Sequence, residues 1–397
     1  METLDNPVKD FYANYKFNTT LPVISCTNYE DVLNKAKTTK TSCILYNNTK
    51  NVVADKALQI NLTFPNGVEV VLVLNVELTG KSSVKIDGSN FGVSNLYLTG
   101  GSSSFKAPSF IVELTAVNLK LINFSMLNFK CADADKDYVC VKKTATNFQM
   151  FNSSLNGKSN TGVFLRFDFP LNNYIKCCTF QNFNIISSPN GGEAIRLATS
   201  DYENQKANCT IDQCYFNKCL GDPEVVSVKC SANTIKNCIF ENNGSSKLVL
   251  RHAHNITVDK CYFSGSGIRV YGTDHVIQNI QLINEANILL DNKSGSSYVP
   301  AANVKVNNVY YENVKTPVTN NGKNCTVTNV VKQLKYTKED FLSNTPSIIV
   351  DPPVDPPVGP PVGPPVGPVI DPDKIYKLNI DLTGKQIADI LAQIENQ

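Results

Sequence analysis

The sequence contains no tryptophan, only three histidines, and no marked excess of either charge. Its 37 lysines and arginines nearly balance 35 aspartates and glutamates, which leaves a formal net charge of +2. A dedicated nucleic-acid-binding protein usually carries a strong basic excess, so nucleic acid is not an expected partner. No run of about 18 apolar residues occurs, and membrane insertion is therefore not expected either.

A secretory leader is not recognisable in the first twenty residues, METLDNPVKDFYANYKFNTT, because they contain no apolar core. The chain has 13 cysteines, an odd number. In a chain of 397 residues without a recognisable leader, we expect reduced thiols that pack as small apolar groups rather than a disulfide framework.

A six-residue pattern recurs along the middle of the chain. It consists of an apolar residue, two polar residues, a small apolar residue, any residue, and a large apolar residue. The clearest copies are IKCCTF at 175–180, IDQCYF at 211–216, IKNCIF at 235–240 and VDKCYF at 258–263, with looser copies beginning at 121, 277 and 306. The spacing between the clear copies, about 23 to 36 residues, is typical of one turn of a parallel β-helix with occasional insertions.

This repeat predicts an all-β fold, a right-handed parallel β-helix in which strands of successive coils stack into a solenoid. The small and large apolar positions alternate with the period of a strand. Stacking would place Cys178, Cys214, Cys238 and Cys261 in one inward ladder, with neighbouring rungs about 4.8 Å apart. A leucine-rich repeat would need a leucine ladder and a β-propeller would need hairpin turns, and both signals are missing.

The composition divides the chain into four parts. These are an N-terminal arm at 1–24, the β-helix at 25–345, a proline-rich linker at 346–373 and a tail at 374–397. The segment NYEDVLNKA at 28–36 predicts a helix that caps the open end of the solenoid. The run DPPVDPPVGPPVGPPVGPVI at 351–370 predicts a stiff, extended spacer.

The tail has the pattern of a short amphipathic helix that begins near Thr383. Its apolar face would hold Ile387, Ile390, Leu391 and Ile394. Such a helix beyond a rigid spacer suits oligomerisation or docking to a larger particle, and a loosely ordered tail is the alternative.

Four polar segments near the repeats hold the candidate chemistry: NGGEAIRLATSD at 190–201, GDPEVVSVKC at 221–230, LVLRHAHN at 248–255 and SGIRVYG at 266–272. Counted back from the repeat of each coil, Lys229, Arg251 and Arg269 fall at nearly the same position. We therefore expect three cations nearly in line on successive coils, which is costly unless an anion binds there.

Carboxylate and amide side chains accompany these cations. Asp222 and Glu224 begin the coil of Lys229, and Asn190 and Glu193 lie one coil earlier. Each residue alone has a simpler interpretation, because a glycine-rich or Gly-Asp segment is usually just a turn. Their order on adjacent coils favours a functional site.

Taken in order, these segments resemble polysaccharide lyase family six, the group that contains chondroitinase B and many alginate lyases. The similarity covers roughly residues 25–335. It rests on Asn-Gly-Gly-Glu at 190–193, an acidic pair followed by lysine at 222–229, and Arg-His at 251–252. The sequence departs from the family pattern at Ala198, Cys230 and Ala253, and Asp222 stands where the longer glutamate is expected.

The resemblance implies cleavage of a uronate-containing polysaccharide by β-elimination, and alginate is favoured over chondroitin or dermatan sulfate. It implies that Lys229 is the catalytic base and Arg251 the acid. It also implies a Ca²⁺ cofactor. The ion would be held by Asn190, Asp222 and Glu224. The neighbouring side chains in the same segments are expected to bind the substrate: Glu193, Arg196, His252, Arg269 and Tyr271.

The chemistry is physically sensible, because the carbon-5 proton of a uronate becomes more acidic when its carboxylate is neutralised. The base must be uncharged to accept that proton, and a lysine beside cations has its ammonium form disfavoured. Arginine is a poor proton donor, so the role of Arg251 rests on the resemblance.

Two other classes of function stay open. One is a non-catalytic β-helix adhesin or virion-surface spike that binds polysaccharide, which the stiff spacer and terminal helix would suit. The other is a pectinase-type hydrolase, which needs paired carboxylates, and only Asp222 and Glu224 are candidates. A location outside the cell or on a particle surface is expected for all three.

Overall fold

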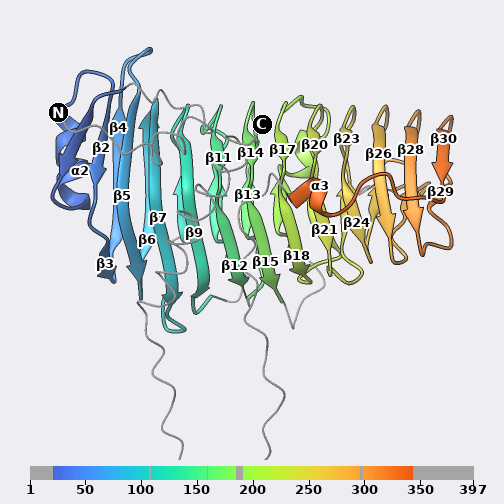
Figure 1. The fold of residues 1–397 in the computed structure, drawn as a ribbon, viewed down its shortest axis with the longest axis horizontal. Helices are drawn as coiled ribbons and strands as arrows, with labels where there is room; N and C mark the ends of the chain where they lie inside the picture. Colours follow the sequence, from blue (N-terminus) through green and yellow to red (C-terminus); the bar gives the residue numbers. More distant parts are fainter. Residues whose placement is uncertain are drawn as a thin grey trace, which may run out of the picture. The chain divides into compact units, whose positions relative to one another are not determined.

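The computed structural model describes residues 21–106, 109–133, 135–158, 160–184, 191–295 and 298–342, which all belong to one structural unit. In this unit the chain forms a long stack of short strands, coil after coil (Figure 1). The linker, the C-terminal tail and most of the N-terminal arm lie outside the described residues, so their expected structures stay predictions. No helix in the described ranges is long and apolar enough to cross a membrane.

The larger of two sheets contains 19 strands in the described part of the chain, and many coils contribute two strands to it. Its strands are β1 (Val23–Cys26), β2 (Cys43–Asn47), β3 (Asn51–Ala54), β5 (Val70–Thr79), β7 (Phe91–Gly101), β9 (Lys120–Lys130), β11 (Gln149–Phe151), β12 (Ser154–Lys158), β14 (Tyr174–Lys176), β15 (Thr179–Phe183), β17 (Thr210–Asp212), β18 (Tyr215–Cys219), β20 (Thr234–Lys236), β21 (Ile239–Glu241), β23 (Thr257–Asp259), β24 (Tyr262–Ser264), β26 (Val276–Ile283), β28 (Lys305–Glu312) and β30 (Thr326–Val331).

The second sheet contains 11 strands within the same ranges and carries the candidate site. Its strands are β4 (Ala57–Thr63), β6 (Ser83–Ser89), β8 (Val112–Leu114), β10 (Val139–Val141), β13 (Leu165–Phe167), β16 (Ile195–Leu197), β19 (Glu224–Val228), β22 (Lys247–Leu250), β25 (Ile268–Val270), β27 (Ile288–Leu290) and β29 (Val318–Asn320). Two helices and one 3₁₀ turn complete the unit: α2 (Tyr29–Thr38), α3 (Glu339–Leu342) and η1 (Ser200–Tyr202).

The strands pair in parallel, and the register follows the sequence repeat. In β15, β18, β21 and β24, Phe180 pairs with Phe216, Phe216 with Phe240, and Phe240 with Phe263. The ring centroids of these neighbours are 5.1, 4.6 and 4.7 Å apart, and the rings are stacked with nearly parallel planes. The mostly-β, parallel architecture is that of the predicted β-helix.

The predicted cysteine ladder is confirmed. Cys178, Cys214, Cys238 and Cys261 are fully buried, and none of the 13 cysteines forms a disulfide. Burial raises the pKa of the Cys214 and Cys261 thiols, which keeps them protonated. They pack as small apolar groups, as expected.

The repeat spans a bend rather than one continuous strand, which differs from the prediction. β14 ends at Lys176 and β15 begins at Thr179. Between them Cys177 has a left-handed backbone with φ of 54°, and Gln213, Asn237 and Lys260 take the same conformation in the following coils. This conformation turns the chain between two faces of the solenoid, so the apolar residues on both sides still point inward.

The predicted helix at 28–36 is present as α2. The Asn28 side chain caps it by accepting a hydrogen bond from the Asp31 amide at 2.9 Å, and Val32 and Ala36 are buried in the common core. Its role in capping the solenoid stays a prediction.

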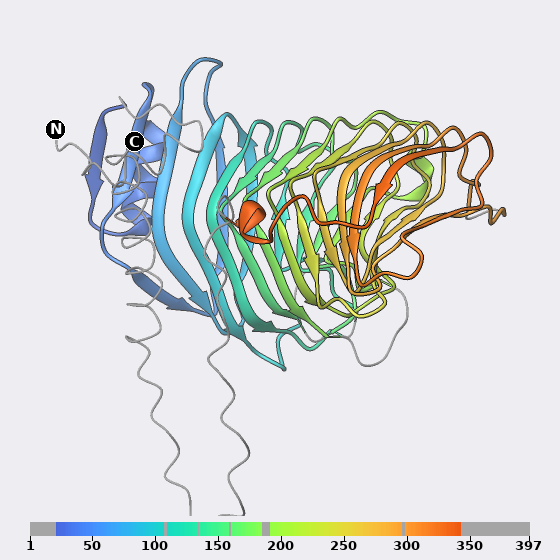
Figure 2. The same ribbon diagram turned by 45° about the vertical axis from the view of Figure 1, so that its right-hand side comes forward.

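After β30 the chain turns back across the larger sheet (Figure 2). We call this returning segment, residues 332–342, the strap. The Gln281 side chain donates a hydrogen bond to the Tyr336 carbonyl. Lys338 forms an ion pair of 2.6 Å with Glu241, and the Phe341 ring packs against Tyr262 with centroids 5.9 Å apart. The strap therefore ties the last coil to three earlier strands, β21, β24 and β26.

Candidate active site

The predicted site residues gather on the second sheet, at β16, β19, β22 and β25. Lys229 directly follows β19 and Arg251 directly follows β22, while Arg196 and Arg269 lie in the middle of β16 and β25. Asn190 lies outside the described residues, so its proposed contact with a metal stays a prediction.

The register corrects the expected line of three cations. Val228 pairs with Leu250 and Leu250 with Val270, so Lys229, Arg251 and Tyr271 follow one another on successive coils. Arg269 instead pairs with Val249, in the neighbouring row of side chains. The sequence count missed this because the three segments differ in length before the repeat.

The cations are neutralised by the chain's own carboxylates, which also corrects the argument for a bound anion. Arg251 donates a hydrogen bond of 2.8 Å to Glu224. The Arg269 guanidinium contacts Asp291 at 2.7 Å. Repulsion between these cations alone therefore does not require a ligand.

Lys229 lies in a partly buried, charged setting. Its ammonium is 4.0 Å from the Glu193 carboxylate, and 13% of its side chain is exposed. Burial lowers the pKa of Lys229, and the nearby Arg196 and Arg251 lower it further, while Glu193 and Glu224 act in the opposite direction. The pKa of Lys229 is lowered, as expected, but burial rather than neighbouring charge is the largest cause of the shift.

Glu193 is almost completely buried, with 2% of its surface exposed. Its Oε1 atom is 4.0 Å from Lys229 and also 4.0 Å from Arg196. Burial raises the pKa of Glu193, whereas both cations lower it. It thus bridges two predicted site cations.

Asp222 is held by the backbone. Its carboxylate accepts hydrogen bonds from the amides of Gly191 at 2.7 Å, Gly192 at 3.3 Å and Glu224 at 2.9 Å. Burial raises the pKa of Asp222, and these amides oppose the rise. The turn that this residue stabilises brings the 191–193 segment beside the start of β19.

A hard cation has partial support from unsatisfied oxygens. The Oε2 atoms of Glu193 and Glu224 are buried and have no hydrogen-bond partner among the described residues. Buried carboxylate oxygens normally have a partner, and such oxygens are ligands that Ca²⁺ prefers. In the same ranges no group of three or more histidine, cysteine, aspartate or glutamate side chains is arranged to hold a metal. The oxygens of Glu193 and Glu224 could therefore bind calcium only if other oxygen donors complete its coordination.

Further charged residues that the sequence did not single out extend the site toward β10. Arg166 pairs in register with Arg196, and its guanidinium contacts Asp137 at 2.8 Å and Asp168 at 3.1 Å. Lys142 also contacts Asp168. These residues lie outside the four polar segments, and only the pairing of β13 with β16 brings them beside the site.

The two remaining predicted substrate-binding residues are largely enclosed. His252 is 3% exposed, and its Nδ1 atom is 3.6 Å from Glu203. Burial lowers the pKa of His252, so the neutral ring is favoured. Tyr271 is 1% exposed, with its ring centroid 4.7 Å from that of Tyr298. Tyr298 was not predicted, because its loop carries no repeat.

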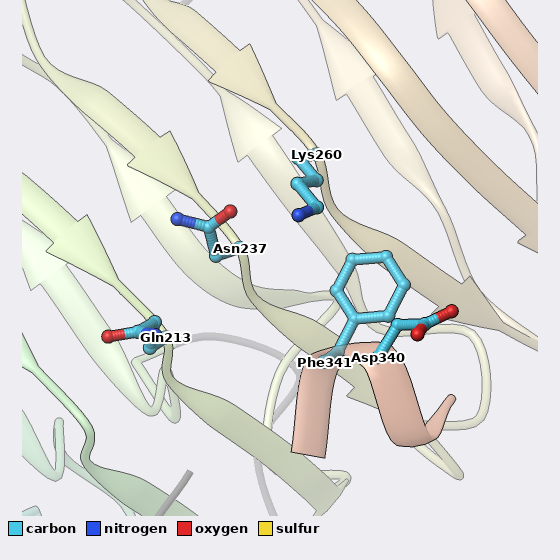
Figure 3. Close-up of a pocket in the computed structure, with 5 residues that line it drawn as sticks. All are labelled: Gln213, Asn237, Lys260, Asp340 and Phe341. Atoms are coloured by element: carbon cyan, nitrogen blue, oxygen red, sulfur yellow. The ribbon is translucent and has the colours of Figure 1, made fainter. Parts of the chain in front are cut away.

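A cavity of about 250 Å³ lies elsewhere, between the larger sheet and the strap (Figure 3). It is lined by Gln213, Asn237, Lys260, Asp340 and Phe341. None of the predicted site residues lines this cavity. The charged residues on β16, β19, β22 and β25 of the second sheet are therefore the stronger candidate for the active site.

A model of the chondroitinase B family matches residues 72–339, more than half of the chain. No curated protein matches the sequence of this chain.

Several solved structures share the fold. AlyGC, described as a PL6 family alginate lyase, is 19% identical with a TM-score of 0.63 over 78% of this chain and 46% of its own. A PL6 alginate lyase solved with a trisaccharide is 18% identical, with a TM-score of 0.59 over 74% of this chain and 70% of its own. The PL6 polysaccharide lyase Pedsa3628 of Pseudopedobacter saltans is 18% identical, with a TM-score of 0.58 over 81% of this chain and 89% of its own. The chain therefore spans less than half of AlyGC.

Proposed function

Because the chain belongs to the chondroitinase B family of polysaccharide lyases, we propose that it cleaves a uronate-containing anionic polysaccharide by β-elimination. The observation that carries this proposal is the position of Lys229. It is a partly buried lysine with a lowered pKa, and it lies one coil from Arg251. A perturbed titratable group beside a specific charged partner is typical of an active site.

Lys229 acts as the base. Its neutral amine takes the carbon-5 proton of the uronate, the bond from carbon 4 to the leaving oxygen breaks, and a double bond forms between carbons 4 and 5. Burial favours the neutral amine that this step needs. Glu193, 4.0 Å away, is placed to stabilise the ammonium that results.

Arg251 acts at the leaving oxygen, where the family resemblance assigns the acid. Its hydrogen bond to Glu224 through Nη1 fixes the guanidinium, and the Nη2 group would meet the anionic sugar. Arg196 and Arg269, on neighbouring coils of the same sheet, would contact further carboxylates of the polymer.

A calcium ion, when bound, would neutralise the substrate carboxylate and so make the carbon-5 proton more acidic. Asp222, Glu224 and Asn190 would hold it. The unpartnered oxygen of Glu224 supports this assignment. The role of Asn190 stays a prediction.

We propose alginate as the polymer, ahead of chondroitin or dermatan sulfate. Two of the structurally similar proteins described above are alginate lyases, one of them solved with a trisaccharide. Action outside the cell or on a particle surface is part of the same proposal, because that is where such polymers occur.

The test is an ultraviolet assay of the full chain against alginate, chondroitin sulfate and dermatan sulfate, with and without a chelator. A lyase leaves an unsaturated uronate that absorbs, whereas a hydrolase leaves sugars that do not. We expect absorbance to rise with alginate, and to rise more slowly in the presence of the chelator. Binding without any product would overturn the proposal in favour of an adhesin or spike.

A further inference from the structure

The cavity between the larger sheet and the strap is lined by one polar side chain from each of three consecutive coils (Figure 3). Gln213, Asn237 and Lys260 occupy the bend between the two strands of their coils, with φ of 54°, 54° and 49°. Because these bends share one backbone conformation, the repeat itself sets the three side chains in a row. The larger sheet therefore contributes two amides and an ammonium to the cavity.

The strap supplies the remaining wall through Asp340 and Phe341 of α3. The Phe341 ring packs against Tyr262 and Tyr336, with centroids 5.9 and 5.8 Å apart. The Asp340 Oδ2 atom accepts a hydrogen bond from the Thr337 amide at 2.6 Å, which fixes the carboxylate. The fold thus positions an aromatic ring and a carboxylate at the cavity before any ligand binds.

Lys260 brings a positive charge to the cavity. Its ammonium lies 5.4 Å from the centroid of the Tyr336 ring, and no carboxylate among the described side chains forms an ion pair with it. By contrast, Lys338 of the strap is paired with Glu241 at 2.6 Å. An ammonium without a carboxylate partner of its own suits an anionic group on a ligand.

The other polar groups of the cavity suit hydroxyls. The Asn237 amide nitrogen donates to Asp212 at 2.8 Å, and its oxygen lies on the side of Lys260 (Figure 3). The Gln213 amide can donate and accept, and the Asp340 carboxylate can accept from hydroxyl groups. The volume is about 250 Å³, compared with about 30 Å³ for one water in the liquid. The cavity is therefore large enough for more than a single bound water.

We propose that this cavity is a second, non-catalytic binding site that takes one uronate unit of an acidic polysaccharide. Lys260 pairs with the uronate carboxylate. The two amides and Asp340 bind the hydroxyls, and the Phe341 ring packs against the C–H groups of the sugar. The inference takes its class of ligand from the proposed function. A second attachment point lengthens the time that the protein stays on a polymer, because each site keeps the other at a high effective concentration of sugar.

The test compares Lys260→Gln with Lys218→Gln, each in the Lys229→Arg protein so that the probe is not cleaved. Both lysines have a left-handed backbone, and Gln213 shows that glutamine fits this conformation. Lys218 belongs to β18 and does not line the cavity. The probe is a saturated alginate trisaccharide, titrated by calorimetry. We expect two binding sites per chain, one of which Lys260→Gln weakens about tenfold or more, since it loses a charged hydrogen bond. Lys218→Gln should keep both.

A neutral mannose trisaccharide, in which hydroxymethyl groups replace the carboxylates, separates recognition of charge from a structural effect. Lys260→Gln should leave its binding unchanged. Fewer than two sites for the alginate trisaccharide, a second site that Lys260→Gln does not weaken, or equal losses for the charged and neutral sugars would overturn the inference alone. A parent that yields no unsaturated product from any polyuronate would overturn the proposed function, whereas binding that depends on Lys260 would still support the second site.

Discussion

Lys229 is held where its ammonium form is unfavourable, so its identity should matter more than its charge. Lys229→Arg keeps the charge and the approximate reach but cannot lose a proton near neutral pH. We expect the variant to bind polyuronate and to lose turnover by about 10²–10⁴-fold. Equilibrium binding and the ultraviolet assay measure the two properties separately. Near-parental turnover would show that another residue is the base, and His252 would be the next candidate.

His275 is a second residue whose neutral form the folded structure favours. It is fully buried; its Nδ1 atom accepts the Ile256 amide at 3.0 Å, and Nε2 donates to the Tyr271 carbonyl at 2.8 Å. Burial lowers the pKa of His275 from 6.5 to about 4. The unfolded chain therefore binds more protons than the folded chain between these values, so the free energy of unfolding falls as pH drops through this window.

For His275 this predicts a loss of about 3 kcal/mol between pH 7 and pH 4. His275→Gln retains a donor and an acceptor but does not titrate. Urea unfolding at the two pH values should show a smaller difference for the variant than for the parent. An equal difference in both proteins would mean that His275 does not titrate in this way.

The candidate site could be recognised from sequence only where its residues lie near the repeat. Lys229 and Arg251 could be placed on consecutive coils by counting. The partner of Arg251, Glu224, lies 27 residues earlier in the chain. Their contact depends on the register between β19 and β22, which the sequence does not reveal. Tyr298 comes from a loop without a repeat, and no pattern marks it.

At the scale of single elements, the phenylalanine ladder is the most regular part of the core. Phe240 is fully buried between Phe216 and Phe263, with centroids 4.6 and 4.7 Å away. Phe240→Ala should lower the free energy of unfolding by about 3–5 kcal/mol, since it removes both stacking contacts and leaves a cavity. Val52→Ala, at a position 65% exposed, should change it by less than about 0.5 kcal/mol. Urea unfolding compares them, and similar midpoints for both variants would refute the prediction.

The strands themselves could be predicted where the apolar repeat is strong, as at β15, β18, β21 and β24. The bends could not. At the equivalent position in four coils the left-handed residue is Cys177, Gln213, Asn237 or Lys260, and only asparagine is a usual choice for that conformation. Tertiary stacking, rather than local preference, imposes the bend on the others.

At the scale of the whole molecule, the strap and the tail should be separable. Deleting residues 351–397 should leave turnover unchanged, because this part is predicted to be an independent spacer and tail, while any assembly that the tail mediates is lost. Deleting 332–397 also removes the strap, including the buried Phe341 and the Lys338–Glu241 ion pair. That longer deletion should cost at least about 3 kcal/mol, as removal of one buried phenylalanine usually does.

The ultraviolet assay measures the turnover of the two truncated proteins, light scattering their assembly, and thermal melting their stability. If the protein that lacks residues 351–397 is unfolded, the predicted independence of the tail is wrong. Equal stability of both proteins would show that the strap contributes nothing.

The strap also bears on how such a protein can evolve. In an open repeat array, a gene segment that encodes one coil can be duplicated or lost with little effect on distant coils. Here a coil gained between β21 and β30 would move Glu241 about 4.8 Å farther from Lys338 and break their contact. Unequal recombination is thus penalised in this half of the gene and tolerated toward the N-terminal half. Among descendants of this chain, coil number should vary before β21 and stay fixed after it.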